Sequence, residues 1–224
     1  QRNKDSAMSP APESARSAAV SVLNKACQGS RYTDKLFQEA AGRIREKQKA
    51  TDLISGTLRN LKTIDTVIEA VSGCPPARID RRLRNIIRTG TYEFLYQPRS
   101  PEYCIINEAV NICRHRCSKK QSGFTNAVLR QLQRAIEDRD VALRNSDKQK
   151  TVPRNSSRGC LLKDSILPSP ANPVKYLNAA FSIPEWLISE WLSNYTEQQV
   201  HRICFASNRR PSVYVTPDIL KITA

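Results

Sequence analysis

The chain has 224 residues, of which 39% are hydrophobic, so a real but modest core can form in one large domain or two small ones. Its 36 Lys and Arg residues outnumber 21 Asp and Glu residues, which gives a formal net charge of +15 that attracts polyanions, most commonly nucleic acid. No apolar run reaches about 18 residues, which excludes a membrane span.

Residues 1–13 are polar and are predicted to form a disordered arm. From Ser14 onward, apolar residues recur at three- and four-residue spacings in consecutive stretches, each of which predicts an amphipathic helix. Because no segment between residues 14 and 137 alternates convincingly with a period of two, we expect an all-α domain over this range. The helical stretches are 15–26, 36–44, 50–61, 64–71, 79–94, 105–113 and 124–136.

Gly90 lies on the apolar face of the stretch 79–94. Because glycine has no side chain to hold a neighbour away, its position predicts that another helix crosses closely there. We therefore expect Gly90 at a helix–helix contact inside the bundle.

The segment "SGFTNAVLR" is expected to open the helix 124–136. In this interpretation Ser122 or Gly123 caps the helix, and Phe124 is its first apolar anchor. The amide of Asn126 in the first turn then bonds the backbone of the loop before "INEAV", whose Asn107 opens the preceding helix. Both motifs would be structural clasps.

Residues 138–172 are polar and basic without a sustained period, and they are predicted to be a linker or a long mobile loop. A small, mainly helical domain is predicted over 173–224, with Pro184 in the first turn of one helix. Thr196 and Gln199 have the spacing of a capping box for the last helix. Val213 and Val215 alternate as at the start of a strand, so we expect a further unit with a sheet to follow.

The seven cysteines are scattered, and several lie on predicted apolar faces, namely Cys27, Cys113 and Cys204. This pattern is typical of buried thiols in a reducing compartment, the cytoplasm, and not of a disulfide framework. The polar start of the chain lacks the apolar region of a secretory signal. Since the first residue is Gln, we expect a processed piece of a longer protein.

No complete catalytic, cofactor or metal site is predicted. The seven glycines are at least 13 residues apart, which excludes the phosphate-binding loops that need closely spaced glycines. "CRHRC" at 113–117 has no second cluster to complete the four ligands usual for structural zinc.

The basic residues are the candidate site. Arginines on a helix can bind phosphates through their planar guanidinium groups, although a charged helix face is often only solvated. The predicted RNA contacts are Arg16, Arg78, Arg81, Arg82, Arg88, Arg114, Arg116, Lys119, Lys120 and Arg130.

Two blocks of sequence resemble known families. "TYEFLY", "INEAVNICR" and "GFTNAVLRQL", preceded by "ISGTLRNLKTID", closely resemble the NusB-like helical domain. The segment "FSIPEWLISEWLSNYTEQQVHRICFASNRRPSVYV" resembles the connecting region of bacterial ribosomal RNA cytosine-5 methyltransferases of the RsmB (Sun/Fmu) type, with Asn208 and Pro211 matching an Asn-x-x-Pro turn. The resemblance covers most of residues 14–216, and the segment 138–172 is unmatched.

The resemblance implies a NusB-like bundle that recruits ribosomal RNA. It also implies that S-adenosylmethionine and two catalytic cysteines belong to a later, absent catalytic domain, since the Pro-Cys and Thr-Cys motifs do not occur here. The expected partners are ribosomal RNA and the remainder of the same polypeptide. Two alternatives stay open: a free-standing NusB-like factor in antitermination or ribosome assembly, and a helical scaffold whose charge only keeps it soluble.

Overall fold

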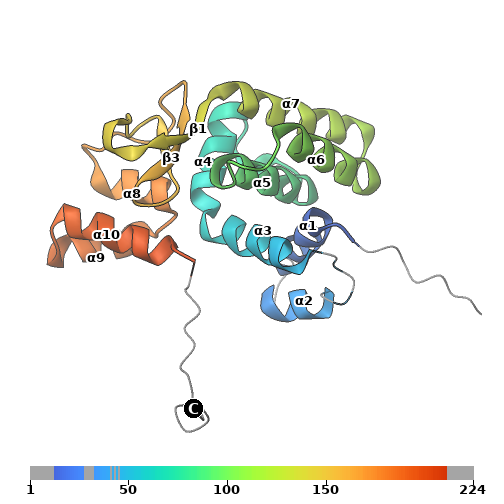
Figure 1. Cartoon of the computed structure of the whole chain (residues 1–224), viewed down its shortest axis with the longest axis horizontal. Coiled ribbons are helices and arrows are strands. Elements are labelled where there is room, and N and C mark those ends of the chain that lie inside the picture. The colour runs from blue at the N-terminus through green and yellow to red at the C-terminus, as the bar shows by residue number, and fades with distance from the viewer. Residues whose placement is uncertain (1–12, 28–32, 41, 43, 45, 211–224) are drawn as a thin grey trace, which may run out of the picture.

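The computed structural model describes residues 13–27, 33–40, 42, 44 and 46–210. Its first part is a bundle of helices, which confirms the predicted helical fold class, and a smaller module follows that combines a sheet with further helices (Figure 1). Residues 1–12 of the predicted arm and the predicted strand at Val213 and Val215 lie outside the described residues. The last residue of that arm, Glu13, is described and forms a bridge with Ile44. The bundle helices are α1 (Ala15–Ala26), α2 (Thr33–Ala40), α3 (Lys47–Arg59), α4 (Leu61–Ser72), α5 (Arg81–Tyr96), α6 (Glu102–Arg116) and α7 (Lys119–Ala135).

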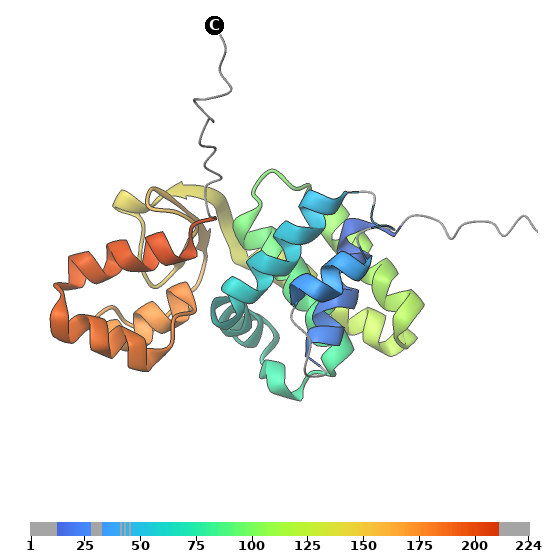
Figure 2. The same cartoon turned by 90° about the horizontal axis from the view of Figure 1, so that it is seen from below.

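Helix α5 is the central helix of the bundle. Every residue from Asn85 to Leu95 is buried, because α1, α3, α4, α6 and α7 all pack around it (Figure 2). A Cβ atom on Gly90 would lie 3.1 Å from the side chain of Leu129 and 3.7 Å from that of Ile105. The predicted close crossing at Gly90 is therefore confirmed, and both α6 and α7 take part in it.

The prediction of a linker over 138–172 is wrong as far as residue 162, because residues 136–162 contain the three strands of an antiparallel sheet. The strands are β1 (Ile136–Ala142), β2 (Thr151–Pro153) and β3 (Arg158–Leu162), in the order β1-β3-β2. Val152, Cys160 and Leu162 are fully buried and belong to the same core as the helices. Strands this short give too few residues for an alternating pattern, and the longest one, β1, is mostly exposed.

Arg139 on β1 fastens the sheet to the bundle. Its guanidinium donates hydrogen bonds to the backbone carbonyls of Glu93, Phe94, Gln97 and Ser100 at 2.7–3.1 Å. It also lies over the ring of Phe94, 5.4 Å from the ring centroid. The last carbonyls of a helix have no partner inside the helix and carry partial negative charge, so a cation there stabilises the end of α5.

Three helices complete the sheet module, which we define as residues 136–208: α8 (Pro173–Phe181), α9 (Glu185–Asn194) and α10 (Glu197–Asn208). They enclose a second, smaller core around Leu177, Ile188, Val200 and Cys204. The predicted capping box at Thr196 is confirmed, and Pro184 lies one residue earlier than predicted, at the N-cap of α9.

The sheet module also contacts the bundle through α8 and α4. The Oγ atom of Ser182 accepts a 2.9 Å hydrogen bond from the backbone N–H of Thr63 and lies 3.0 Å from the Thr63 hydroxyl. Ser182 adopts a left-handed backbone conformation, with φ of 58°, where α8 ends. Two separate connections, through β1 and through α8, therefore hold the module against the bundle.

Cys113 and Cys204 are buried as expected, but Cys27 is exposed because it lies at the C-cap of α1, beyond the buried stripe. All seven cysteines are free thiols. No helix among the described residues combines the length and apolarity that crossing a membrane requires.

Candidate nucleic-acid interface

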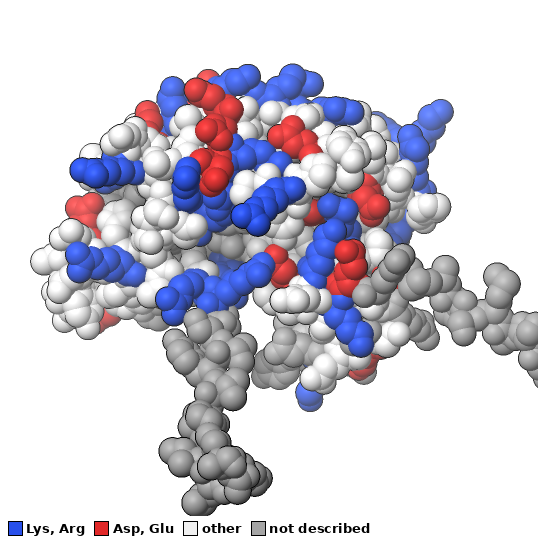
Figure 3. Space-filling view, in the orientation of Figure 1, with Lys and Arg blue, Asp and Glu red and all other residues white. Residues whose placement is uncertain are grey.

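Lys and Arg side chains cover both the bundle and the sheet module on the face drawn in Figure 3, with fewer Asp and Glu side chains between them. Exposure and ion pairing decide which of these cations can bind an anion.

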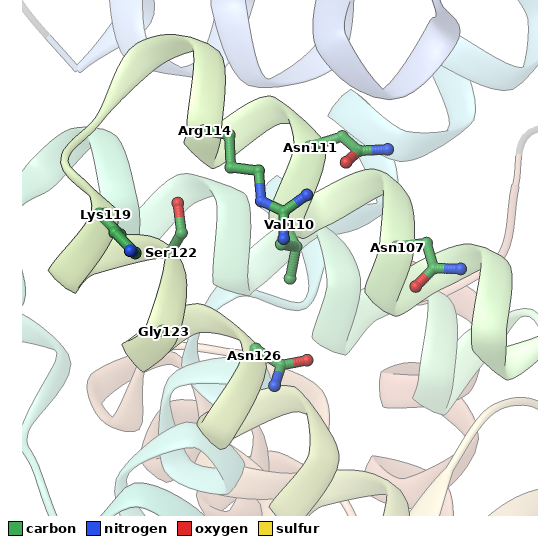
Figure 4. Close-up of a pocket in the computed structure, with 8 residues that line it drawn as sticks. All are labelled: Asn107, Val110, Asn111, Arg114, Lys119, Ser122, Gly123 and Asn126. Atoms are coloured by element: carbon green, nitrogen blue, oxygen red, sulfur yellow. The ribbon is translucent and has the colours of Figure 1, made fainter.

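The clearest concave surface on the bundle is a groove of about 910 Å³ between α6 and α7, here called the α6–α7 groove (Figure 4). Residues three, four and seven positions apart share a face of a helix, and the two helices turn such faces toward each other. The α6 wall consists of Asn107, Val110, Asn111 and Arg114, and the α7 wall consists of Lys119, Ser122, Gly123 and Asn126.

The chemistry of the α6–α7 groove suits a polyanion with hydrogen-bonding edges. Arg114 and Lys119 are exposed, and neither forms an ion pair with any residue that the structure describes. Figure 4 shows the guanidinium of Arg114 extending from α6 toward α7. Asn107, Asn111 and Asn126 add exposed amides that can both donate and accept hydrogen bonds, and the lining contains no acidic residue.

Ser122 lies in the wall of this groove with an unusual hydroxyl group. The residue is 6% exposed, and its buried hydroxyl oxygen has no hydrogen-bond partner within the described part of the chain. A buried polar group normally has a partner, so the unpaired hydroxyl of Ser122 is an exception within the structure of α7. Beside it, a Cβ atom on Gly123 would meet nothing within 4 Å, so the glycine keeps this wall open.

The structural role predicted for "SGFTNAVLR" is wrong. Helix α7 begins at Lys119, because Ser118 is its N-cap and forms a capping box with Gln121, so Gly123 and Phe124 lie inside the helix. Asn126 is exposed in the second turn and makes no hydrogen bond to the start of α6 among the described residues. The capping box at Ser118 starts the helix about one turn earlier than predicted, so the segment lies in the wall of the groove and does not connect α7 to α6.

Three further predicted cations are exposed where the polypeptide enters α5: Arg78, Arg81 and Arg82. This end of α5 lies beside the turn between α6 and α7, because Asp80 and Arg82 both act on the pKa of the Cys117 thiol in that turn. Burial is the main cause that raises this pKa, to about 11. Cys113 and Asp80 also raise it, and the charge of Arg82 lowers it. We call the exposed cations Arg78, Arg81, Arg82, Arg114, Lys119 and Lys120 the basic rim.

Arg16 and Arg88 are not available as RNA contacts, which corrects the prediction for both. Arg16 donates to the Glu93 carboxylate at 2.6 and 2.7 Å, and Arg88 donates to the Asp65 carboxylate at 2.7 and 2.6 Å. Only 12% and 10% of the two arginine side chains is exposed. Burial alone would lower the pKa of Arg16, but its bonds to Glu93 raise it, so the guanidinium stays charged.

Two other predicted cations have intermediate positions. Arg116 donates to the Glu13 carboxylate at 2.9 Å and to the Ser17 hydroxyl at 2.8 Å, so it mainly connects α6 to the start of α1. Arg130 is exposed one turn beyond Asn126 on α7, where it donates a 3.2 Å hydrogen bond to Gln133. Arg130 therefore extends the α7 wall, whereas Arg116 is largely structural.

The uncharged polar residues that line the groove are not indicated by the charge pattern of the sequence. Asn107, Asn111, Ser122 and Asn126 carry no charge, but they recur at helical spacing on two consecutive helices. That spacing, combined with the absence of acidic residues from 111 to 130, was the signal in the sequence. No cluster of His, Cys, Asp and Glu in the described ranges is arranged to hold a metal ion.

One group of known proteins is similar to the helical bundle of the chain. A family model described as the NusB family matches residues 13–134. The chain is 31% identical over 101 residues to the transcription antitermination protein NusB of Lysinibacillus sphaericus, covering 43% of this chain and 80% of that protein. A crystal structure of antitermination factors NusB and NusE in complex with dsRNA has a similar fold, with a TM-score of 0.50 and 23% identity over 54% of this chain and 94% of the other.

A second group of relatives matches far more of the chain. It is 26% identical over 195 residues to the "Probable ribosomal RNA small subunit methyltransferase B" of Bacillus subtilis, which covers 85% of this chain and 37% of that protein. The protein of the same description from Synechocystis is 24% identical over 212 residues, which covers 93% and 42%. The chain thus spans less than half the length of these relatives.

Proposed function

The chain belongs to the NusB family, and from this premise we propose that it is the RNA-binding region of a ribosomal RNA methyltransferase. The extent of the similarity carries this proposal. The family match ends at residue 134, whereas the alignments with the two methyltransferases extend over 195 and 212 residues. Such lengths require the sheet module as well as the bundle, and that combination favours the methyltransferase over NusB alone.

In the proposed protein, the work is divided between two regions. The methyl group would come from S-adenosylmethionine bound elsewhere in the whole protein, with cytosine C5 of small-subunit RNA as the acceptor. The residues of this chain hold the RNA, and none of them is assigned to catalysis or to the cofactor. The whole protein would act in the cytoplasm, where its RNA substrate is found.

The α6–α7 groove and the basic rim support RNA as the ligand. Arg114 can form paired hydrogen bonds with a phosphate, and Lys119 offers a point charge beside it. Each phosphate neutralised by such a cation releases condensed counterions, which makes binding dependent on salt. Asn107 and Asn126 can contact base edges or ribose hydroxyls, which would position the RNA along the groove.

A salt titration of binding to a small-subunit ribosomal RNA fragment tests this proposal. We expect affinity to fall as salt rises, and the slope of log K against log salt to decrease by about 1 in Arg114→Gln and in Lys119→Gln. Lys35→Gln is the matched control, because Lys35 is an exposed lysine on α2, away from the groove. No measurable binding at low salt, or slopes equal to the control in both groove variants, would contradict the proposal.

A second candidate is a free-standing factor that acts in transcription antitermination or ribosome assembly. Local identity favours it, since the 34% identity over 89 residues with NusB of Rhodopseudomonas palustris exceeds the values for the methyltransferases. This candidate predicts binding to purified NusE, measured by calorimetry with the chain alone. Binding to the RNA fragment without binding to NusE would favour the methyltransferase.

A further inference from the structure

We propose that the cleft between the sheet and α10, here called the α10 cleft, binds one unpaired nucleotide of RNA. This inference rests on the proposed RNA-binding function but assigns a second site, in the sheet module. The cleft has a volume of about 820 Å³ and is lined by the β1–β2 and β2–β3 connections together with α8 and α10. A space of this size lies within the usual range of small-molecule sites, about 300–1,000 Å³.

The inner wall of the α10 cleft is aromatic. Tyr176, Phe181, His201 and Phe205 all line it. The Phe181 and Phe205 rings meet edge to face with centroids 4.8 Å apart, and the His201 ring lies 6.1 Å from Tyr176 and 6.2 Å from Phe181. Tyr176 and Phe181 are buried and support this wall from the core, whereas His201 and Phe205 are half-buried and offer the ring surfaces on which a nucleobase can stack.

The mouth of the cleft carries charges of both signs. Arg144 and Lys148 are exposed, and neither forms an ion pair with the residues described by the structure, so both can bind a phosphate. Glu197 lies within 3.8 Å of His201 and can accept a hydrogen bond from the amino group of a base. The cations can bind the phosphate of a nucleotide, the carboxylate can bind an amino group of its base, and the aromatic rings can stack on that base.

The turn between β2 and β3 supplies hydroxyl groups at the same mouth. Ser156 and Ser157 are both exposed and line the cleft. The Ser157 hydroxyl donates to Asn155 at 3.0 Å, whereas the Ser156 hydroxyl bonds no described residue. A free serine hydroxyl can bond the ribose 2′-OH, the group that distinguishes RNA from DNA. A base that is paired and stacked in a duplex could not enter this cleft, so the ligand must be unpaired.

The test compares a labelled single-stranded RNA decamer with a hairpin that presents the same sequence as a duplex. Affinities for the full 224-residue chain are measured by fluorescence anisotropy. We expect His201→Ala to weaken single-strand binding about tenfold, which corresponds to about 1.4 kcal/mol, and to leave duplex binding unchanged. Lys148→Gln should reduce the salt slope for the single strand by about 1. Lys35→Gln is again the control.

The outcomes separate this inference from the function on which it rests. Arg114→Gln should weaken binding of both RNAs, because it belongs to the α6–α7 groove. If both cleft variants bind the single strand with the same affinity and the same salt slope as the control, the nucleotide site is overturned. That result would favour a polypeptide as the occupant of the cleft. No binding of either RNA by the unaltered chain would overturn both proposals. Lys148 is at the surface, so its variant stays informative even if His201→Ala does not fold.

Discussion

At the scale of single residues, buried carboxylates decide which arginines are free. The Glu93 side chain is 1% exposed and receives two hydrogen bonds from Arg16, whose sequence position is 77 residues away. A carboxylate this deeply buried needs a charged partner, because burial of an isolated charge is costly. Arg16 is therefore an internal ion-pair partner of Glu93 and not part of the exposed basic rim.

Glu93→Gln should be strongly destabilising. The substitution leaves the buried Arg16 guanidinium without the carboxylate that it bonds, and the expected loss is about 3–5 kcal/mol in the free energy of unfolding. Urea denaturation monitored by circular dichroism measures it. Glu69→Gln, at an exposed position on α4, is the control and should change stability by less than about 0.5 kcal/mol. Equal stabilities for both variants would contradict the structural role of the ion pair.

His201 makes stability depend on pH. Burial lowers its pKa below the ordinary value of 6.5, the charge of Lys148 lowers it further, and Glu197 opposes both. Between the ordinary and the lowered pKa, the unfolded chain binds more protons than the folded one, so folding stability must fall as pH decreases through this window. Above about pH 6.5 both states are neutral at this site, and the effect disappears.

Urea denaturation between about pH 7.5 and about pH 5 tests this, because the range extends from about one unit above the ordinary histidine pKa to about 1.5 units below it. His201→Gln should lose less stability on acidification than the unaltered chain, because the replacement does not titrate. NMR titration of the two histidine side chains, assigned with the same variant, gives the pKa directly. A His201 pKa above that of a model histidine peptide would contradict the prediction.

At the scale of elements, one side chain of the sheet reaches into the bundle. Arg139 bonds four carbonyls at the end of α5 and in the loop that follows it, and β1 pairs with β3, which supplies Cys160 and Leu162 to the core. The end of α5, the sheet and the bundle core should therefore unfold together. A linker in this position would open independently.

Arg139→Ala should cost about 2–4 kcal/mol in the free energy of unfolding. Hydrogen bonds to charged groups contribute about 1.5–3 kcal/mol each, but bonds from one guanidinium are not additive, and the carbonyls lose their partner. Hydrogen exchange should also accelerate in β1 and at the end of α5. Arg144→Ala is the comparison, since Arg144 is exposed two residues after β1 ends. Unchanged exchange in β1 would show that Arg139 does not hold the sheet.

At the scale of the whole molecule, the cations behind the net charge of +15 fall into two groups, paired and exposed. Some cations are paired inside the fold, as Arg16, Arg88 and Arg139 are, and others are exposed, as in the basic rim and at the mouth of the α10 cleft. Only exposed cations can attract a polyanion, so the formal charge overstates the positive charge that the surface presents. The basic rim lies on the bundle and the α10 cleft lies in the sheet module, so under the two proposals each module has its own RNA contacts.

Reversal of Arg78, Arg81 and Arg82 to Glu separates RNA binding from a scaffold role. All three side chains are exposed, so folding should be preserved while the net charge of the surface falls by six units, two for each Arg→Glu substitution. We expect affinity for the ribosomal RNA fragment to fall more than about tenfold at low salt, because each lost phosphate contact reduces counterion release. Native circular dichroism with unchanged RNA affinity would instead support the scaffold interpretation.

The amino-acid sequence alone determined the helical bundle, the close crossing at Gly90 and the capping box at Thr196. The helical stretches and the capping box depend on residues within a few turns of one another, and helical periodicity is a local signal. The crossing at Gly90 joins different helices, but the position of a glycine on an apolar face marks it in the sequence. The sequence did not predict the sheet, because β2 and β3 have only three and five residues and strand pairing is not local. The start of α7 was misplaced because the capping signal at Ser118 was overlooked.

Only the tertiary structure decided which polar residues are free to act. Arg81 and Arg88 lie seven positions apart on the same helix, yet Arg81 is exposed and Arg88 is buried against Asp65. The partner of Arg88 lies 23 residues away, and that of Arg16 lies 77 residues away. Charge is a property of each residue, but its availability depends on contacts between distant segments, and those exist only once the helices have packed.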